Sequence, residues 1–155
     1  MTWKISMARM EDEASILELI HQETLSSNVI PREKIDWENF VVCKIGDHIV
    51  GCVGYKIWDK ILPEVISTIV VEEYRGKTKI GKALVEKVLK TLKRRGFRSA
   101  FCLTENVRFF SKFDFIVVDV GLFPAKIIAD CAKCPKNYGS PHNPLCPDQA
   151  MYLKL

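Results

Sequence analysis

The sequence predicts an α/β fold, α+β in the stricter sense, with helices packed on a mixed, mostly antiparallel sheet of about seven strands. Apolar residues alternate with polar ones, or run together, in seven short segments bounded by turn residues. Between these segments, apolar residues recur at helical spacing. The elements then follow one another in the order βαβββαβαββ, which is typical of helices packed on a mixed sheet.

The N-terminal half provides the first strands and one helix. Residues 3–7 alternate and predict a strand, and residues 11–25 predict a helix whose acidic first turn suits its positive end. No Ser or Thr stands at the start of this helix, so periodicity alone supports it. Residues 26–38 form a polar connection with one helical turn. Strands at 40–45 and 49–55 flank Gly46-Asp47-His48, a pattern typical of a hairpin.

The C-terminal half begins with the clearest elements. Residues 64–71 are almost entirely β-branched and predict a central strand. A helical apolar stripe follows over 80–95, ended by Gly96. The remaining elements are short, and they comprise strands at 97–103, 115–120 and 149–153 and a helix at 106–112.

Length and composition limit the class of protein. The 155 residues suit one domain, 1–155, with a Cys/Pro-rich loop at about 124–148. Apolar residues make up 48% and charged residues 27%, which excludes disordered, collagen-like and coiled-coil chains. No apolar run approaches the ~20 residues of a membrane helix. The first residues lack the apolar run of a signal peptide. We therefore expect a cytoplasmic protein without a membrane partner.

Positive charge is concentrated in one segment. Residues 75–98 contain ten basic residues and one acid, a net charge of +9 in a chain whose total is +4. Such a block indicates that a polyanion binds at one place. The phosphates of a cofactor and those of a nucleic acid both fit this expectation.

The segment from the 64–71 strand to the 80–95 helix carries the clearest chemistry. It leaves a strand, turns at Gly76 and Gly81, and enters a helix. A helix N-terminus presents unpaired N–H groups, and a glycine-bearing loop before it lets amides close around a phosphate. The spacing also matches a nucleotide P-loop, but Ala83 stands where that motif needs Ser or Thr. A P-loop nucleotidase is therefore disfavoured.

Two motifs resemble a known family. Val70–Leu84, with a Tyr-Arg-Gly step and then Ile-Gly-Lys-Ala-Leu, resembles the acetyl-CoA-binding motif of the GNAT N-acetyltransferases. Phe109–Phe115 (FFSKFDF) stands where that superfamily often has FYEKLGF. The order of the preceding elements also matches, so the resemblance covers nearly the whole chain and implies the GNAT fold.

Further segments resemble one branch of the superfamily. Val118–Lys126 (VDVGLFPAK) is similar to a segment of N-acetylglutamate synthase acetyltransferase domains. The cysteines after residue 130 resemble those of the short, single-domain amino-acid N-acetyltransferases of arginine biosynthesis. Arg32 stands where those proteins carry a substrate-binding arginine.

The resemblance implies a reaction and the residues for it. An acetyl group would pass from acetyl-CoA to a small primary amine, most simply the α-amine of glutamate or a similar amino acid, by direct attack. Glu64 is the candidate base, Arg32 would pair with the substrate's α-carboxylate, and Lys126 would contact an acidic substrate. The expected cofactor-binding residues are Ile69, Val70, Val71, Arg75, Gly76, Lys77, Thr78, Lys79, Ile80, Gly81 and Lys82.

The chain departs from the family pattern at several positions. The usual Arg-Gly-x-Gly-x-Gly loop is one residue longer here and lacks its middle glycine. Phe110 replaces the tyrosine that many members use as general acid. Ile66 stands where an arginine is common in the short relatives, and Asp114 replaces a glycine.

The six cysteines form two groups. Cys43, Cys52 and Cys102 lie in apolar runs and are expected to be small buried hydrophobes. The tail instead has metal-ligand types at compatible spacing: Cys131, Cys134, His142 and Cys146. Three thiolates and an imidazole suit tetrahedral zinc. Reduced or disulfide-forming cysteines that pin a loop are the favoured alternative.

Several functions stay open at this stage. The acceptor is expected to be a small-molecule amine, with a polyamine, an aminoglycoside-like amine or a protein N-terminus as alternatives. A zinc-stabilised nucleic-acid-binding module is a second class, but a basic helix without interleaved aromatic residues disfavours it. No nucleic-acid partner is therefore expected. A CoA-binding protein without transferase activity is a third class, and a homodimer is left open as the assembly.

Overall fold

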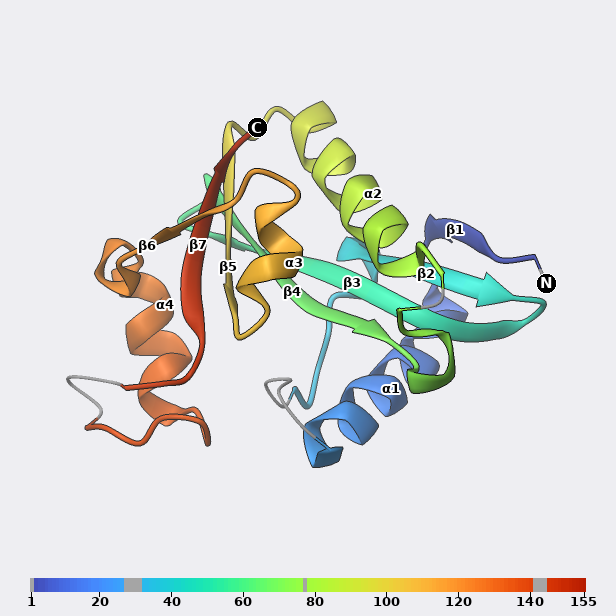
Figure 1. The fold of residues 1–155 in the computed structure, drawn as a ribbon, viewed down its shortest axis with the longest axis horizontal. Helices are drawn as coiled ribbons and strands as arrows, with labels where there is room; N and C mark the ends of the chain where they lie inside the picture. The colour runs from blue at the N-terminus through green and yellow to red at the C-terminus, as the bar shows by residue number, and fades with distance from the viewer. Residues whose placement is uncertain (1, 27–31, 77, 141–144) are drawn as a thin grey trace. The chain divides into compact units, whose positions relative to one another are not determined.

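The computed structural model describes residues 2–26, 32–76, 78–140 and 145–155 (Figure 1). Within them the chain forms seven strands in one sheet, in the order β1-β2-β3-β4-β5-β7-β6. The strands are β1 Lys4–Met7, β2 Phe40–Ile45, β3 His48–Trp58, β4 Leu62–Val70, β5 Ser99–Thr104, β6 Ile116–Val118 and β7 Gln149–Lys154. The β4–β5 pair is parallel, whereas β1–β2, β2–β3, β5–β7 and β6–β7 are antiparallel. The predicted mixed, mostly antiparallel sheet is confirmed.

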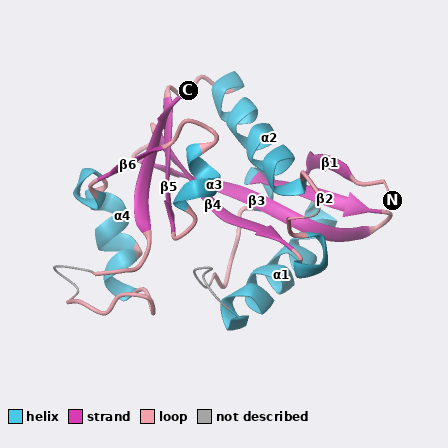
Figure 2. Ribbon diagram, in the orientation of Figure 1, coloured by secondary structure: helices cyan, strands magenta, loops and turns pink. Residues whose placement is uncertain are grey.

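The described residues also form four α-helices and several 3₁₀ turns (Figure 2). The helices are α1 Glu13–Ser26, α2 Ile80–Arg94, α3 Val107–Ser111 and α4 Pro124–Ala129. Three of them match expectation to within two residues at each end. The fourth, α4, lies in the segment expected to be a loop at about 124–148, so that expectation was wrong for its first residues. A six-residue helix is too short to show a periodic apolar stripe, which is why the sequence did not reveal it.

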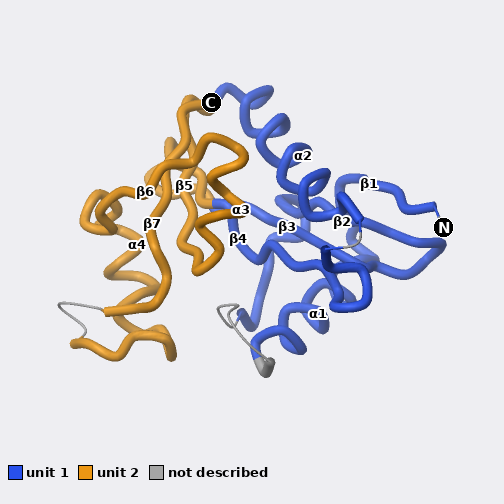
Figure 3. The backbone as a smooth tube through the Cα atoms, in the orientation of Figure 1, with its two compact units in different colours: residues 1–56, 65–96 blue, residues 57–64, 97–155 orange. Residues whose placement is uncertain are grey.

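The chain divides into two compact units, coloured separately in Figure 3. Unit 1 comprises residues 1–56 and 65–96, and unit 2 comprises residues 57–64 and 97–155. Strands β3 and β4 contribute residues to both units. The single domain expected over 1–155 stays a prediction, and each unit is described by itself.

In unit 1, α2 buries the apolar stripe that the sequence predicted. Its buried residues are Ile80, Leu84, Val85, Val88 and Leu92. The turn that leads into α1, the 3₁₀ segment Met10–Asp12, is closed by an aspartate. The Asp12 carboxylate accepts a hydrogen bond from the Arg9 backbone N–H (2.8 Å) and pairs with Lys44 (2.8 Å). A carboxylate at this end also interacts favourably with the helix dipole.

Unit 2 has its own apolar core around β5. Trp58, Phe101, Phe123 and Ala150 form one buried cluster. The rings of Phe101 and Phe123 stack with centroids 4.0 Å apart. Because Phe123 immediately precedes α4, this stacking fixes the start of that helix against β5.

The cysteines expected in the core lie there. Cys43, Cys52 and Cys102 are buried free thiols, as predicted. Burial, together with the charge of Glu23, raises the pKa of Cys52 to about 12. Such a thiol stays protonated and behaves as a small apolar side chain.

No helix in the described part of the chain has the length and apolar character needed to cross a membrane.

Candidate active site

The segment expected to bind the cofactor lies wholly in unit 1. After β4 the chain makes a 3₁₀ turn at Glu72–Tyr74, reverses at Gly76 and enters α2. Gly76 has φ of +69°, a left-handed conformation that favours glycine. The Thr78 hydroxyl donates to the Tyr74 carbonyl (3.0 Å) and accepts a long hydrogen bond from the Ile80 backbone N–H (3.4 Å). Lys77 lies outside the described residues.

This arrangement fits a phosphate at the start of α2. The first N–H groups of a helix have no intrahelical acceptor, and they carry the positive end of its dipole. Lys79 occupies the cap position, and a lysine side chain has no acceptor to offer them. Lys82, in the first turn, is exposed and lies 3.8 Å from the Glu86 carboxylate. Amides and lysine ammonium groups are the donors that a pyrophosphate requires.

Arg75 is engaged with the protein itself. Its Nε donates to the Val70 carbonyl (2.6 Å), and its guanidinium pairs with Glu23 on α1. The Val71 N–H donates to the Val50 carbonyl (2.9 Å). The Arg75 side chain therefore joins the loop to α1 and to the end of β4. Its predicted role, like those of Ile69, Val70 and Val71, stays a prediction.

Glu64 lies in unit 2, near the start of β4. Its side chain is 2% exposed and both carboxylate oxygens have partners. Trp58 Nε1 donates to Oε1 (3.1 Å), and Lys126 Nζ lies 3.1 Å from Oε2. The sequence resemblance indicated Glu64 as the candidate base. The structure shows it buried between an indole and an ammonium group.

Lys126, from α4, is the partner that the sequence did not assign to Glu64. Its side chain is 0% exposed, and Nζ also lies 2.8 Å from the Asp130 carboxylate. The ammonium group lies 5.8 Å from the centre of the Trp58 ring. Burial lowers the pKa of Lys126, but the two carboxylates more than offset this and hold it above its ordinary value. The ammonium group of Lys126 thus already pairs with two carboxylates. Its expected contact with an acidic substrate stays a prediction.

Arg32 lies in unit 1, within the connection between α1 and β2. Its Nε is buried and has no hydrogen-bond partner among the described residues. Buried donors are almost always paired in folded proteins, so this atom indicates a missing acceptor. The preceding Val29-Ile30-Pro31 lies outside the described residues.

Ser67, on β4 within unit 1, is a residue that sequence reasoning did not single out. Its φ is +52°, a left-handed value inside a strand. Its hydroxyl is buried without a partner among the described residues, while its carbonyl accepts from the Cys52 thiol (3.5 Å). Strained backbone and unpaired polar atoms concentrate at functional sites. A serine in a β-branched run carries no signal of this.

The departures from the family pattern have clear structural settings. Phe110 is buried, and its ring makes edge contacts with Phe109 and Phe115, so it supplies packing and no hydroxyl. Asp114 has φ of +71°, the conformation for which the family's glycine is suited. Aspartate is among the residues that tolerate it. Ile66 is buried in the core of unit 1.

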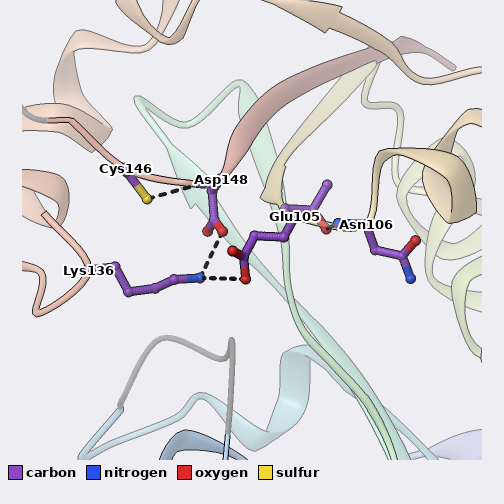
Figure 4. A network of polar contacts seen from close by, with 6 residues as sticks. Glu105, Asn106, Lys136, Cys146 and Asp148 are labelled. Carbon is purple, nitrogen blue, oxygen red and sulfur yellow. Dashed lines mark hydrogen bonds and ion pairs between the residues drawn. The ribbon is translucent and has the colours of Figure 1, made fainter.

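The cysteine tail is held by a polar network (Figure 4). Lys136 pairs with Asp148 (2.7 Å) and contacts Glu105 (3.7 Å), and the Asp148 N–H donates to Cys146 Sγ (3.3 Å). Across the described residues, no three His, Cys, Asp or Glu side chains are grouped as a metal site. Because His142 lies outside them, the zinc site of Cys131, Cys134, His142 and Cys146 stays a prediction.

Comparisons with known proteins agree with the sequence resemblance. The uncharacterized N-acetyltransferase CT2212 of Chlorobaculum tepidum is 36% identical over 98 residues, which cover 63% of this chain and 63% of that protein. This chain therefore spans less than two thirds of that relative.

Solved structures share the fold over nearly the whole chain. N-acetylglutamate synthase from Neisseria gonorrhoeae, complexed with coenzyme A and N-acetyl-glutamate, matches with a TM-score of 0.78 at 14% identity. That match covers 100% of this chain and 35% of the synthase. The protein Rv2747 from Mycobacterium tuberculosis, in complex with CoA, matches with a TM-score of 0.74 at 20% identity, over 98% of this chain and 99% of that one. At these identities the likeness shows the fold.

The family itself follows from the sequence model that matches residues 8–115, described as the acetyltransferase (GNAT) family. This match covers more than half of the chain, including the segment Val70–Leu84 that resembles the acetyl-CoA-binding motif. The enzyme class and the cofactor expected from the sequence, an N-acetyltransferase and acetyl-CoA, are thereby confirmed at the level of the family. The chain belongs to the acetyltransferase (GNAT) family.

Proposed function

We propose that this protein transfers the acetyl group of acetyl-CoA to the α-amine of an amino acid, with glutamate as the first candidate. The observation that carries the acceptor class is the buried, unpartnered Nε of Arg32 among the described residues. A guanidinium group pairs with a carboxylate through two parallel hydrogen bonds. An acceptor that carries an α-carboxylate would supply the missing partner, whereas a polyamine would not.

The fold relatives support the same choice of acceptor. The gonococcal N-acetylglutamate synthase was solved with N-acetyl-glutamate, the acetylated form of a dicarboxylic amino acid. The proposal extends this acceptor to the present chain, together with the place in arginine biosynthesis that the sequence resemblance implies.

The reaction needs few protein groups. The amine nitrogen attacks the thioester carbonyl carbon, a C–N bond forms, the C–S bond breaks, and the CoA sulfur leaves as a thiolate that takes a proton. The acceptor arrives as an ammonium ion, so it must first lose a proton to a base. Glu64 is that base in this proposal. Because its side chain is 2% exposed, the proton reaches it through a water molecule.

The cofactor would be held mainly by backbone groups. The N–H groups at the start of α2 would bind the pyrophosphate, and Lys79 and Lys82 would add charge. The peptide groups of Ile69–Val71 would hold the acetyl-bearing arm. Acetyl-CoA supplies the activated acyl group, and the protein supplies orientation.

The test begins with isothermal titration of acetyl-CoA into reduced protein, where near-stoichiometric micromolar binding is expected. An acceptor panel follows, with glutamate, glutamine, glutamate α-methyl ester, spermidine and a peptide N-terminus. Glutamate should be acetylated fastest and its α-methyl ester poorly. Absent binding would reject the proposal, and a preference for spermidine or the peptide would reject the amino-acid acceptor.

Arg32→Ala tests the carboxylate contact directly. The KM for glutamate should rise about 10- to 100-fold, the value of one charge-assisted contact, while the KM for acetyl-CoA stays unchanged. Arg94→Ala, at an exposed arginine in the last turn of α2, is the matched control and should change neither KM. An unchanged KM for glutamate in Arg32→Ala would remove Arg32 from the proposal.

A further inference from the structure

Glu64, Lys126 and Asp130 form a chain of three charges inside unit 2. Lys126 Nζ lies 3.1 Å from Glu64 Oε2 and 2.8 Å from Asp130 Oδ2. The Glu64 and Lys126 side chains are 2% and 0% exposed, whereas Asp130 is 23% exposed. With all three groups ionised, the cluster carries one positive and two negative charges.

A single Lys–Glu pair would be poorly suited to a base that changes its charge. If a buried Glu gains a proton, the Lys beside it loses its counter-charge. An uncompensated buried charge is strongly destabilising. The pair would therefore resist protonation of the carboxylate, and the base would be weak.

The second carboxylate removes this difficulty. When Glu64 is protonated, the ammonium of Lys126 stays paired with Asp130. When Glu64 is ionised, Lys126 balances it. The cluster has a paired arrangement in both protonation states of Glu64.

Short-range geometry explains how α4 and its C-cap residue supply both partners. Lys126 and Asp130 are four residues apart, and the Asp130 N–H donates to the Lys126 carbonyl (2.9 Å). Residues at this spacing lie on the same face of a helix. The Trp58 indole N–H holds the other oxygen of Glu64 (3.1 Å), which fixes the carboxylate's orientation.

We infer that Lys126 and Asp130 are positioning residues that allow the buried Glu64 to take up the acceptor's proton and release it to solvent without leaving a charge unpaired. The inference rests on the proposed function, in which Glu64 is the base. Lys126 thereby acts on the substrate through Glu64.

The charges of this cluster also act on two thiols of unit 2. The charges of Lys126, Glu64 and Asp130 influence the pKa of Cys131, and the charge of Glu64 influences the pKa of Cys102. Burial raises the pKa of Cys131 to about 11, and it raises that of Cys102 as well. Both thiols are therefore neutral at neutral pH, and the charge balance at Glu64 is set by Lys126 and Asp130.

The test measures kcat against pH, with both substrates saturating, in wild type, Lys126→Met and Asp130→Asn. A general base acts only when it is ionised, so the acidic limb of the profile reports the protonation of the base in the complex. Lys126→Met removes the positive charge beside Glu64 and should move this limb to higher pH by about one unit or more. Asp130→Asn removes the nearby negative charge and should move the limb to lower pH. Lys136→Met, in a second lysine–carboxylate cluster of unit 2, is the matched control and should leave the limb in place.

Opposite shifts in the two variants are the expected result. Unshifted limbs, or shifts of the same sign, would overturn the inference while leaving acetyl transfer to the amino acid in place. Absence of transfer by wild type would instead overturn the proposed function. If Lys126→Met does not fold, Lys126→Arg, which keeps the charge and should keep the limb, and the partly exposed Asp130→Asn decide the question.

Discussion

Unit 2 contains two lysines that each face two carboxylates, and they differ in burial. Lys126 lies between Glu64 and Asp130 with a side chain that is 0% exposed. Lys136 lies between Asp148 and Glu105 with 15% of its side chain exposed, and Glu105 is 31% exposed (Figure 4). The charge count is the same, but the second cluster retains more contact with water.

The second cluster has an evident structural purpose. Asp148 precedes β7, Glu105 follows β5, and Lys136 comes from the tail, so the ion pairs hold the tail against the ends of two paired strands. The Lys126 cluster places a carboxylate in the interior, where desolvation is most costly. A buried charge that packing does not require indicates chemistry. The comparison therefore sets a cluster with a structural role beside one of the same composition to which the proposal assigns a catalytic role.

The largest expected effect is on turnover. Glu64→Gln removes the base, and kcat should fall about 100- to 10,000-fold, the usual contribution of general base catalysis, with unchanged affinity for acetyl-CoA. Steady-state kinetics and titration calorimetry measure the two quantities. Asp148→Asn is the equivalent change in the other cluster and should keep kcat within a few-fold. Equal losses in both variants would abolish the distinction between the clusters.

The next effect is on stability. Lys126→Met leaves Glu64 buried without its counter-charge and should lower the free energy of unfolding by about 3–5 kcal/mol. Lys136→Met should lower it by about 1–2 kcal/mol, because water reaches that cluster. Urea unfolding at neutral pH compares the two variants. A larger loss of unfolding free energy in Lys136→Met than in Lys126→Met would contradict the expectation that the more buried lysine contributes more.

A third effect appears at alkaline pH. Burial lowers the pKa of Lys126 and Lys136, but their carboxylate partners outweigh it and hold both above the ordinary value of 10.5. The stabilising contribution of these two lysines is fully present below pH 10.5 and is lost as the pH rises through their raised pKa values in the folded protein. The urea midpoint of wild type should therefore decline above this pH. Each methionine variant should show a shallower decline, and parallel curves would contradict the raised pKa values.

The smallest effect is expected at Glu105. Its carboxylate is 3.7 Å from Lys136 and 31% exposed, so Glu105→Gln should cost about 0.5 kcal/mol or less. Asp148→Asn, at a 2.7 Å contact with a nearly buried carboxylate, should cost more. Thermal unfolding of the two variants in parallel checks the order. A similar cost in both would mean that exposure does not weaken this contact.

The cofactor segment shows how much local sequence can reveal. The glycine turn, the basic helix and its buried apolar stripe were all predictable. Backbone N–H groups at a helix start are available whatever the distant sequence, and apolar periodicity reports which face is buried. The GNAT resemblance depended on the same continuous segment. The hydrogen bond of Arg75 to the Val70 carbonyl and its ion pair with Glu23 were not predictable, because Glu23 belongs to another helix.

By itself, the sequence determined the order of the seven strands and of the first three helices, and the family. It also singled out the loop proposed to bind phosphate and the candidate residues Glu64 and Arg32. Only the tertiary structure decided that Lys126 pairs with Glu64, that α4 exists, and that Ser67 is strained with a buried hydroxyl. The physical reason is range. Periodicity and helix ends depend on residues a few positions apart. The ion pair between Glu64 and Lys126 instead requires that β4 and α4 come together in the fold. Burial there strengthens the interaction between the two charges.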